Sequence, residues 1–121
     1  MNPLRIPMQV VFYRDDGQWV AHCLQFDLAG VGDTKADAIA LLSEAIDIQI
    51  RESLKSGNPR NLFSPADSEL FQMFAAGQDV AESELRVAIA PHPDIVIERT
   101  EAREYLRPLR QPLNRSGLVP A

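Results

Sequence analysis

The segment from residue 17 to residue 34 constrains the fold of this chain more than any other feature. Residues 19–25 suit a β-strand whose alternate side chains face opposite ways, and residues 26–31 are typical of a shorter strand. Gly32, Asp33 and Thr34 then lead into a long amphipathic segment. No metal-ligand or nucleophile motif lies in this part of the sequence, so it indicates a scaffold and favours binding over catalysis.

The residues before this segment predict the strand that pairs with it. From Ile6 to Phe12, apolar residues occupy every second position, which is the period-two pattern of a strand. Pro7 has no backbone N–H and should lie at the start of the strand or on a sheet edge. Residues 15–18 follow, and Gly17 can supply the positive φ that a tight hairpin turn needs. We therefore expect an antiparallel meander of three strands.

The long amphipathic segment is predicted to be a helix from Thr34 to about Lys55. Thr34 is a good N-cap, and Asp37 stands three residues later, as in a capping box. Asp33 and Asp37 also suit the positive end of the helix dipole. Residues 56–59, Ser-Gly-Asn-Pro, should end the helix. Its predicted apolar face is broad and consists of Ala38, Ile39, Leu41, Leu42, Ala45, Ile46, Ile48 and Ile50.

The second half of the chain predicts less regular structure. A short helix is expected over residues 67–76, where Gly77 should end it. Residues 85–89 alternate as in a strand, and residues 95–97 suit a last short strand. Prolines beyond Arg99 argue against continued regular structure.

Together these elements predict an α+β fold. We expect an antiparallel sheet in β-β-β-α-β order, one long helix packed across it, a short helix, and a C-terminal strand or hairpin. The chain has 121 residues, 45% of them apolar, which suits one compact domain, assigned here to residues 1–98. Residues 99–121 are predicted to form a basic, proline-containing tail.

Charge is distributed unevenly around a formal net charge of -5. Acidic residues outnumber basic ones through residue 98, whereas arginine supplies every positive charge after it. An acidic body repels phosphate backbones and favours a basic protein partner. Cys23 is the single cysteine, no apolar run is long enough for a membrane helix, and the N-terminus lacks a long apolar stretch. We therefore expect a cytoplasmic protein without a membrane partner.

The residues with catalytic potential are better explained by structure. His22 and Cys23 are neighbours in a strand and should point to opposite faces, which separates a potential base from a potential nucleophile. Gly30 and Gly32 lack the third glycine and the lysine of phosphate-binding loops, so we interpret them as residues of the strand-to-helix turn. The sequence therefore predicts no enzymatic activity, no catalytic residue and no cofactor.

Carboxylates in the first half of the chain are candidate metal ligands, because hard cations prefer oxygen ligands. Helix spacing places Asp37 and Glu44 along one flank and Asp47 on another side, while Asp33 belongs to the helix start. We therefore predict no metal site. A metal-dependent nuclease is the alternative, and it would require Asp27 or Asp33.

Aromatic and basic residues leave nucleic-acid binding open. Phe12, Tyr13 and Trp19 suit either base stacking or core packing, and core packing is favoured because only Arg14 adds a positive charge among these strands. The tail arginines recur at spacings of three or four, as along one helix face. The candidate nucleic-acid contacts are Arg99, Arg103, Arg107 and Arg110. The alternative function is a nucleic-acid-binding transcriptional regulator whose DNA or RNA binding disappears when residues 99–121 are removed.

Four short motifs resemble those of the HicB-type antitoxins. Trp19-Val20-Ala21 is followed by Asp27-Leu28-Ala29-Gly30, by Gly32-Asp33-Thr34, and by Asp37-Ala38 at the start of the helix. The resemblance covers about residues 6–56. Ala29 stands where the family pattern has proline.

This resemblance implies a partial ribonuclease-H-like fold without the catalytic carboxylates. Members of this family bind and inactivate a small basic toxin that cleaves mRNA, and many carry a C-terminal DNA-binding element. Residues 57–121 show no helix-turn-helix or ribbon-helix-helix pattern. The leading expectation is therefore an antitoxin that masks a small basic toxin. An orphan scaffold with another ligand is a further alternative. An unprotected sheet edge also predicts a homodimer or higher oligomer.

Overall fold

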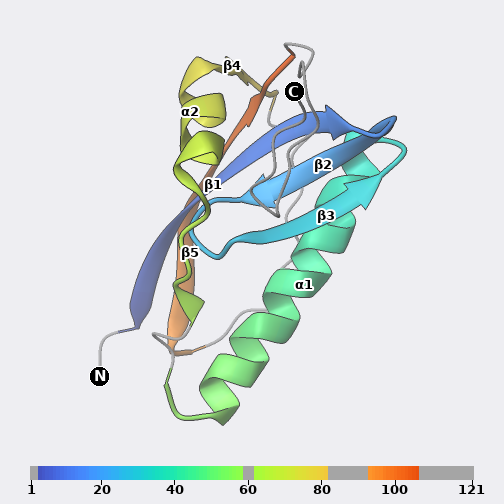
Figure 1. Cartoon of the computed structure of the whole chain (residues 1–121). Helices are drawn as coiled ribbons and strands as arrows, with labels where there is room; N and C mark the ends of the chain where they lie inside the picture. Colours follow the sequence, from blue (N-terminus) through green and yellow to red (C-terminus); the bar gives the residue numbers. More distant parts are fainter. Residues whose placement is uncertain (1–2, 59–61, 82–92, 107–121) are drawn as a thin grey trace.

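The computed structural model describes residues 3–58, 62–81 and 93–106 (Figure 1). The chain opens with the strands β1 (Leu4–Asp15), β2 (Gln18–Cys23) and β3 (Leu28–Gly32). The helices α1 (Lys35–Lys55) and α2 (Ser68–Ala76) follow, and then the strands β4 (Gln78–Asp79) and β5 (Ile95–Glu104). The predicted α+β class, with one long helix packed across the sheet, is confirmed. The strand predicted over residues 85–89 lies outside the described residues.

The sheet is mixed, whereas the sequence predicts an antiparallel one. Its described strands have the order β3-β2-β1-β5-β4, and the pairs β2/β3, β1/β2 and β4/β5 are antiparallel. β5 runs parallel to β1, with Ile95 beside Leu4 and Glu104 beside Phe12. Side chains alternate between the two faces of a strand whatever its direction, so the sequence pattern does not reveal this parallel pair.

The β1–β2 hairpin closes as its sequence predicts. Asp16 and Gly17 both have positive φ values, 51° and 80°, which is the backbone required at the two central positions of a type I′ turn. The Arg14 guanidinium donates a hydrogen bond to the Gly17 carbonyl at 2.9 Å. The turn thereby fixes the register in which Asp15 pairs with Gln18.

Both ends of α1 are capped. The predicted helix start at Gly32, Asp33 and Thr34 is where the structure places it, and the Asp37 backbone N–H donates to the Thr34 hydroxyl at 3.0 Å. At the other end the chain turns back at Gly57, whose φ is 75°. Backbone N–H groups after the helix donate to the carbonyls of its last turn, which is a Schellman arrangement.

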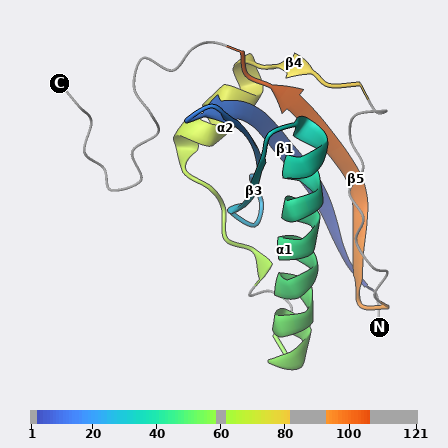
Figure 2. The ribbon, with the colours of Figure 1, turned by 90° about the vertical axis from the view of Figure 1, so that its right-hand side faces the viewer.

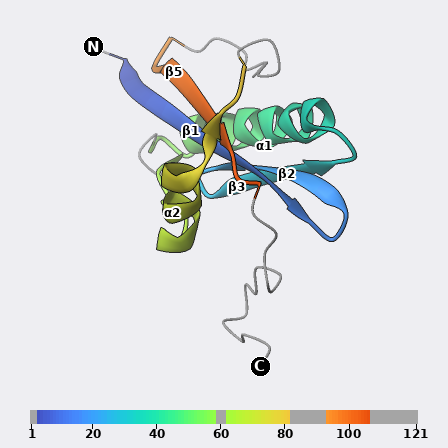
Figure 3. The same ribbon diagram turned by 90° about the horizontal axis from the view of Figure 1, so that it is seen from above.

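The sheet separates two apolar clusters, because α1 and α2 lie on its opposite sides (Figures 2 and 3). Alternate side chains of β1 point into each cluster, as strand geometry requires: Val10 and Phe12 toward α1, and Val11 and Tyr13 toward α2. Neither of these two described helices is long and apolar enough to cross a membrane.

β5 extends further than its sequence predicts. The structure places residues 95–104 in one strand, and the Tyr105 backbone N–H continues the pairing by donating to the Phe12 carbonyl at 2.8 Å. The predicted domain boundary after residue 98 therefore falls inside a strand. The first proline of the tail is at position 108, beyond the end of β5, so it does not interrupt the pairing with the long strand β1.

Cys23 is fully buried in the apolar cluster between the sheet and α1. The ionisation of its thiol therefore provides a test of this burial. Burial raises the pKa of the Cys23 thiol from its ordinary value of 9.0 to about 11. The folded state therefore keeps this proton to a higher pH than the unfolded chain does. Its contribution to the free energy of unfolding is present below pH 9.0 and is lost as the pH rises toward about 11.

We therefore expect the native thiol to resist a thiol reagent at neutral pH and the denatured thiol to react at once. Urea titrations at mildly and strongly alkaline pH should show a steeper loss of stability for the wild-type chain than for Cys23→Ala. Equal slopes for the two proteins would contradict the buried, neutral thiol.

Candidate functional site

β3 forms one edge of the sheet. One side of this strand pairs with β2 over its whole length, from Leu28 beside Cys23 to Gly32 beside Trp19. Its other side meets no strand in the part of the chain that the structure describes. A row of backbone N–H and C=O groups along this side is therefore open to a further strand.

Two glycines bring β3 unusually close to α1. A Cβ atom at Gly30 would lie 2.3 Å from the Ala38 carbonyl oxygen and 2.4 Å from the Leu42 nitrogen, and one at Gly32 would lie 2.5 Å from the Asp37 Cβ. The sequence predicts these glycines as residues of a turn. The structure gives positive φ values to Gly17 and Gly57 instead, so Gly30 and Gly32 serve close approach of strand to helix.

This approach leaves one flank of α1 uncovered beside the edge. Leu41, Ala45 and Ile48 lie on one side of the helix, because they are four and three residues apart. The Leu41 and Ile48 side chains are 44% and 53% exposed, although their apolar character predicted burial. The core instead takes Ile39 and Ile46 from the helix. Because Ile39 and Ile46 face the core, the flank with Leu41 faces away from it, on the side of the helix next to β3.

Acidic residues surround this apolar flank. Asp33, Asp37 and Glu44 are all exposed, the first two at the start of α1 and the third one turn beyond Leu41. Val31, on the edge strand itself, is 46% exposed and points to the sheet face opposite α1, because Gly30 and Gly32 on either side of it face the helix. We call this region the β3–α1 surface, defined by Val31, Leu41, Ile48, Asp33, Asp37 and Glu44.

The hairpin turn at residues 15–17 lies at the acidic end of the β3–α1 surface. Trp19 pairs with Arg14 on one side and with Gly32 on the other, so the turn and the start of α1 share one end of the sheet (Figure 1). Asp16 is exposed in this turn. The end of β3, the hairpin turn and the acidic helix start therefore lie near one another at one end of the sheet.

Trp19 is engaged within the chain and does not present a bare ring for base stacking. The Arg14 guanidinium and the Lys35 ammonium each lie 5.2 Å from its ring centre. Lys35 also pairs with Glu104, which links α1 to β5. Phe12 and Tyr13 are buried. Core packing, the favoured sequence interpretation, describes Phe12 and Tyr13, and Trp19 packs half-buried against the core.

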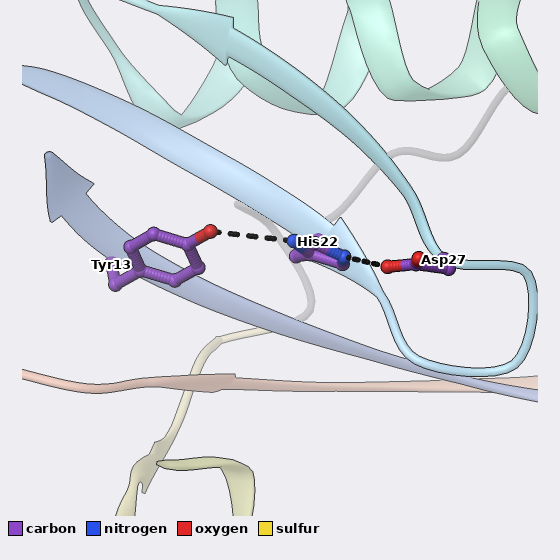
Figure 4. Close-up of polar contacts among 3 residues, drawn as sticks. All are labelled: Tyr13, His22 and Asp27. Carbon is purple, nitrogen blue, oxygen red and sulfur yellow. Dashed lines mark hydrogen bonds and ion pairs between the residues drawn. The ribbon is translucent and has the colours of Figure 1, made fainter. Parts of the chain in front are cut away.

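His22 belongs to a short chain of hydrogen bonds (Figure 4). The Tyr13 hydroxyl lies 3.3 Å from His22 Nδ1, and Asp27 Oδ1 lies 2.7 Å from Nε2. His22 is 4% exposed, and Cys23 points into the opposite cluster, as predicted. Asp27 has a φ of 52°, in the left-handed region that aspartate tolerates better than most residues. The chain of bonds fixes the turn between β2 and β3.

Two of the four predicted nucleic-acid contacts lie in a strand and not on a helix face. Arg99 and Arg103 both lie in β5, and Arg107 and Arg110 lie outside the described residues. The Arg103 guanidinium donates to the Phe74 and Ala75 carbonyls, at 3.2 and 3.4 Å, and lies 4.7 Å from the Phe74 ring centre. It also pairs with Asp79 at 3.4 Å. Arg103 thus holds the last turn of α2 against the sheet.

Replacing Arg103 with alanine is therefore expected to lower the free energy of unfolding by about 1–2 kcal/mol, because capping bonds and ring packing are lost together. Arg103→Lys should recover little, since an ammonium cannot make the same forked contacts. Chemical denaturation of the three proteins measures this difference. Wild-type stability in Arg103→Ala would contradict the anchoring role.

Because Arg99 and Arg103 lie in β5, the test for nucleic-acid binding needs a shorter deletion than residues 99–121. Removing residues 99–121 deletes much of β5, so any loss of binding would be confounded by unfolding. A deletion that begins after Leu106 keeps the described strands intact. Salt-dependent binding of that shorter protein would contradict a role for the tail beyond residue 106.

Carboxylates are dispersed in the described structure. Among residues 3–58, 62–81 and 93–106, no three His, Cys, Asp or Glu side chains gather as a metal-ion site. Asp27 bonds His22 at one end of β3, whereas Asp33 follows the other end.

No protein-family model matches this sequence, and comparisons with curated proteins and with solved structures give no significant match.

The fold and site define a class of protein, an α+β scaffold with an exposed edge strand beside an acidic and apolar helix flank. The sequence predicts an acidic body that favours a basic partner, but it does not assign Asp33, Asp37 or Glu44 to a binding surface, and it predicts Leu41 and Ile48 as part of the apolar face of the helix. One sequence signal could have indicated that Leu41 and Ile48 are exposed. The apolar face of α1 is broad, and it is wider than the part of the helix that packs on the sheet.

Proposed function

We propose that this chain is a non-enzymatic, antitoxin-like protein that binds and masks a small basic protein that cleaves mRNA. The observation that carries this proposal is the β3–α1 surface. There, exposed apolar side chains lie among carboxylates that a basic partner would neutralise. The resemblance of residues 6–56 to the HicB-type antitoxins supports the same conclusion from the sequence.

The composition of the surface suits a protein partner better than a nucleic acid. Leu41 and Ile48 lie together on α1 and give it an apolar part, and exposed apolar side chains that gather in this way mark interaction sites. Val31 adds an apolar side chain on the opposite face of the edge strand, because Gly30 and Gly32 on either side of it face α1. Asp33, Asp37 and Glu44 would repel phosphate groups. Steric masking also needs no catalytic group, only a surface that covers the active site of the partner.

The first test is purification of the tagged full-length chain from its native host after nuclease treatment and washing at high salt. We expect a small basic protein to accompany it in stoichiometric amount, identified by mass spectrometry. Recovery of the chain alone would contradict the proposed function and would favour an orphan scaffold with another ligand.

A matched pair of charge reversals then tests where the partner binds. Asp37→Lys and Glu69→Lys each replace an acidic residue in the first turn of a helix, so both variants lose a similar interaction with the helix dipole. Asp37→Lys lies on the β3–α1 surface and should slow association about tenfold at low salt. Glu69→Lys, on α2, should leave the rate unchanged. Equal rates would exclude this surface.

A further inference from the structure

We propose that the partner adds an extended, basic segment to the sheet as a new strand along the free edge of β3, beside the Leu41 flank of α1. The inference rests on the proposed function and names how the partner is recognised. Strand addition supplies affinity through main-chain hydrogen bonds and specificity through alternate side chains.

The two described edges of the sheet differ in how well they can accept a strand. β4 has only two residues, and Asp79 on it pairs with Arg103 of its neighbour β5. Such a short, charged edge discourages further pairing. β3 has five residues, Leu-Ala-Gly-Val-Gly, with no charge and no proline among them. Among the described residues, the edge at β3 therefore lacks the usual protection.

The neighbouring helix gives an added strand a second surface. Gly30 brings β3 against Ala38 and Leu42, so a strand next to β3 would run beside the exposed flank of α1. Side chains of an extended segment point alternately to the two faces of the sheet. One set would therefore meet Leu41 and Ile48, and the other set would lie beside Val31.

Charge selects a basic segment over a second copy of this chain. Two β3 strands paired antiparallel about Gly30 would bring Asp27, just before β3 in one copy, near Asp33, just after β3 in the other, and like charges brought together repel. A lysine-rich or arginine-rich segment would instead meet Asp33, Asp37 and Glu44. The charges therefore favour a heterologous, basic occupant.

The probe for this inference is a fluorescent peptide of alternating lysine and valine. Its control is a twin with methylated backbone nitrogens, which keeps the charge and side chains but removes the main-chain donors. We expect the first peptide to bind the full chain and to slow hydrogen exchange of β3 amides. The methylated twin should bind at least about tenfold more weakly. Equal affinities, no binding, or unprotected β3 amides would overturn strand addition.

Three lysine substitutions at exposed apolar residues locate the contact. Val31→Lys on β3 and Leu41→Lys on α1 should each weaken peptide binding about tenfold, because lysine repels the basic peptide and blocks the edge. Phe71→Lys is the matched control, since Phe71 is 37% exposed but lies on α2, across the sheet. Thermal unfolding of the three variants checks that each is folded. Equal binding by all three would exclude the edge.

The same variants separate this inference from the proposed function. If a captured basic protein binds Val31→Lys and Leu41→Lys as it binds the wild type, strand addition is wrong and the proposed function stands. If no basic protein is captured but the unmethylated peptide protects β3, the edge site stands and the antitoxin-like function falls. A dimer in light scattering that Val31→Lys abolishes would make a second copy the occupant and overturn the inference.

Discussion

Replacing Gly30 with alanine is expected to destabilise the fold by about 3 kcal/mol, near the upper end for overpacked positions. The added methyl group would lie 2.3 Å from the Ala38 carbonyl oxygen and 2.4 Å from the Leu42 nitrogen. Both are backbone atoms inside a helix, so they cannot turn aside as a flexible side chain does. β3 would have to move off α1, and the β3–α1 surface would change shape with it.

Two other glycines separate this steric effect from the effect of backbone conformation. Gly17 and Gly57 have positive φ values, and a Cβ atom at either position would meet nothing within 4 Å. Alanine at these positions should therefore cost only about 1 kcal/mol, the strain of a left-handed residue. Urea denaturation of Gly17→Ala, Gly30→Ala and Gly57→Ala measures the three costs. A Gly30→Ala protein as stable as Gly17→Ala would contradict the close packing of β3 on α1.

The second large effect is expected at His22. His22→Ala should lower the free energy of unfolding by about 3 kcal/mol, because it leaves a cavity and removes two hydrogen bonds from a buried site. Asp27 would also lose the bond that accompanies its left-handed backbone. The turn that delivers β3 to the sheet edge would therefore loosen.

Milder substitutions measure separately how much the Tyr13 and Asp27 hydrogen bonds to His22 contribute to the free energy of unfolding. Tyr13→Phe removes only the hydroxyl and should cost about 1 kcal/mol. Asp27→Asn keeps an oxygen acceptor for His22 and tolerates a positive φ, so it should cost less than Asp27→Ala. Denaturation curves for the four variants test this order. If Asp27→Ala were as stable as Asp27→Asn, the His22–Asp27 bond would not hold the turn.

Much of the first half of the fold is predictable from local signals. The hairpin turn at Asp16 and Gly17 and the capped start of α1 at Thr34 depend on residues adjacent in the chain, and both lie where the sequence predicts them. The separation of His22 from Cys23 follows from strand alternation alone. Such features need no knowledge of which elements meet in space.

The features that sequence analysis missed depend on tertiary contacts. The parallel direction of β5 and its extension through Arg103 depend on pairing with β1, which alternation does not reveal. Leu41 and Ile48 are as apolar as the buried residues of α1, and their exposure follows from where β3 crosses the helix. The sequence predicts an acidic body, but it reveals neither the position of the carboxylates beside β3 nor the exposed apolar part of the candidate site.

The most direct test of the central claim is a titration of RNA cleavage. The small basic protein that accompanies this chain would be separated from it under denaturing conditions, refolded and incubated with mRNA, while purified chain is added in increasing molar ratio. The account predicts that cleavage falls in proportion and stops at a fixed stoichiometry, and that Leu41→Lys requires a large excess. Cleavage that continues unchanged at saturating wild-type chain would contradict masking, and with it the proposed function.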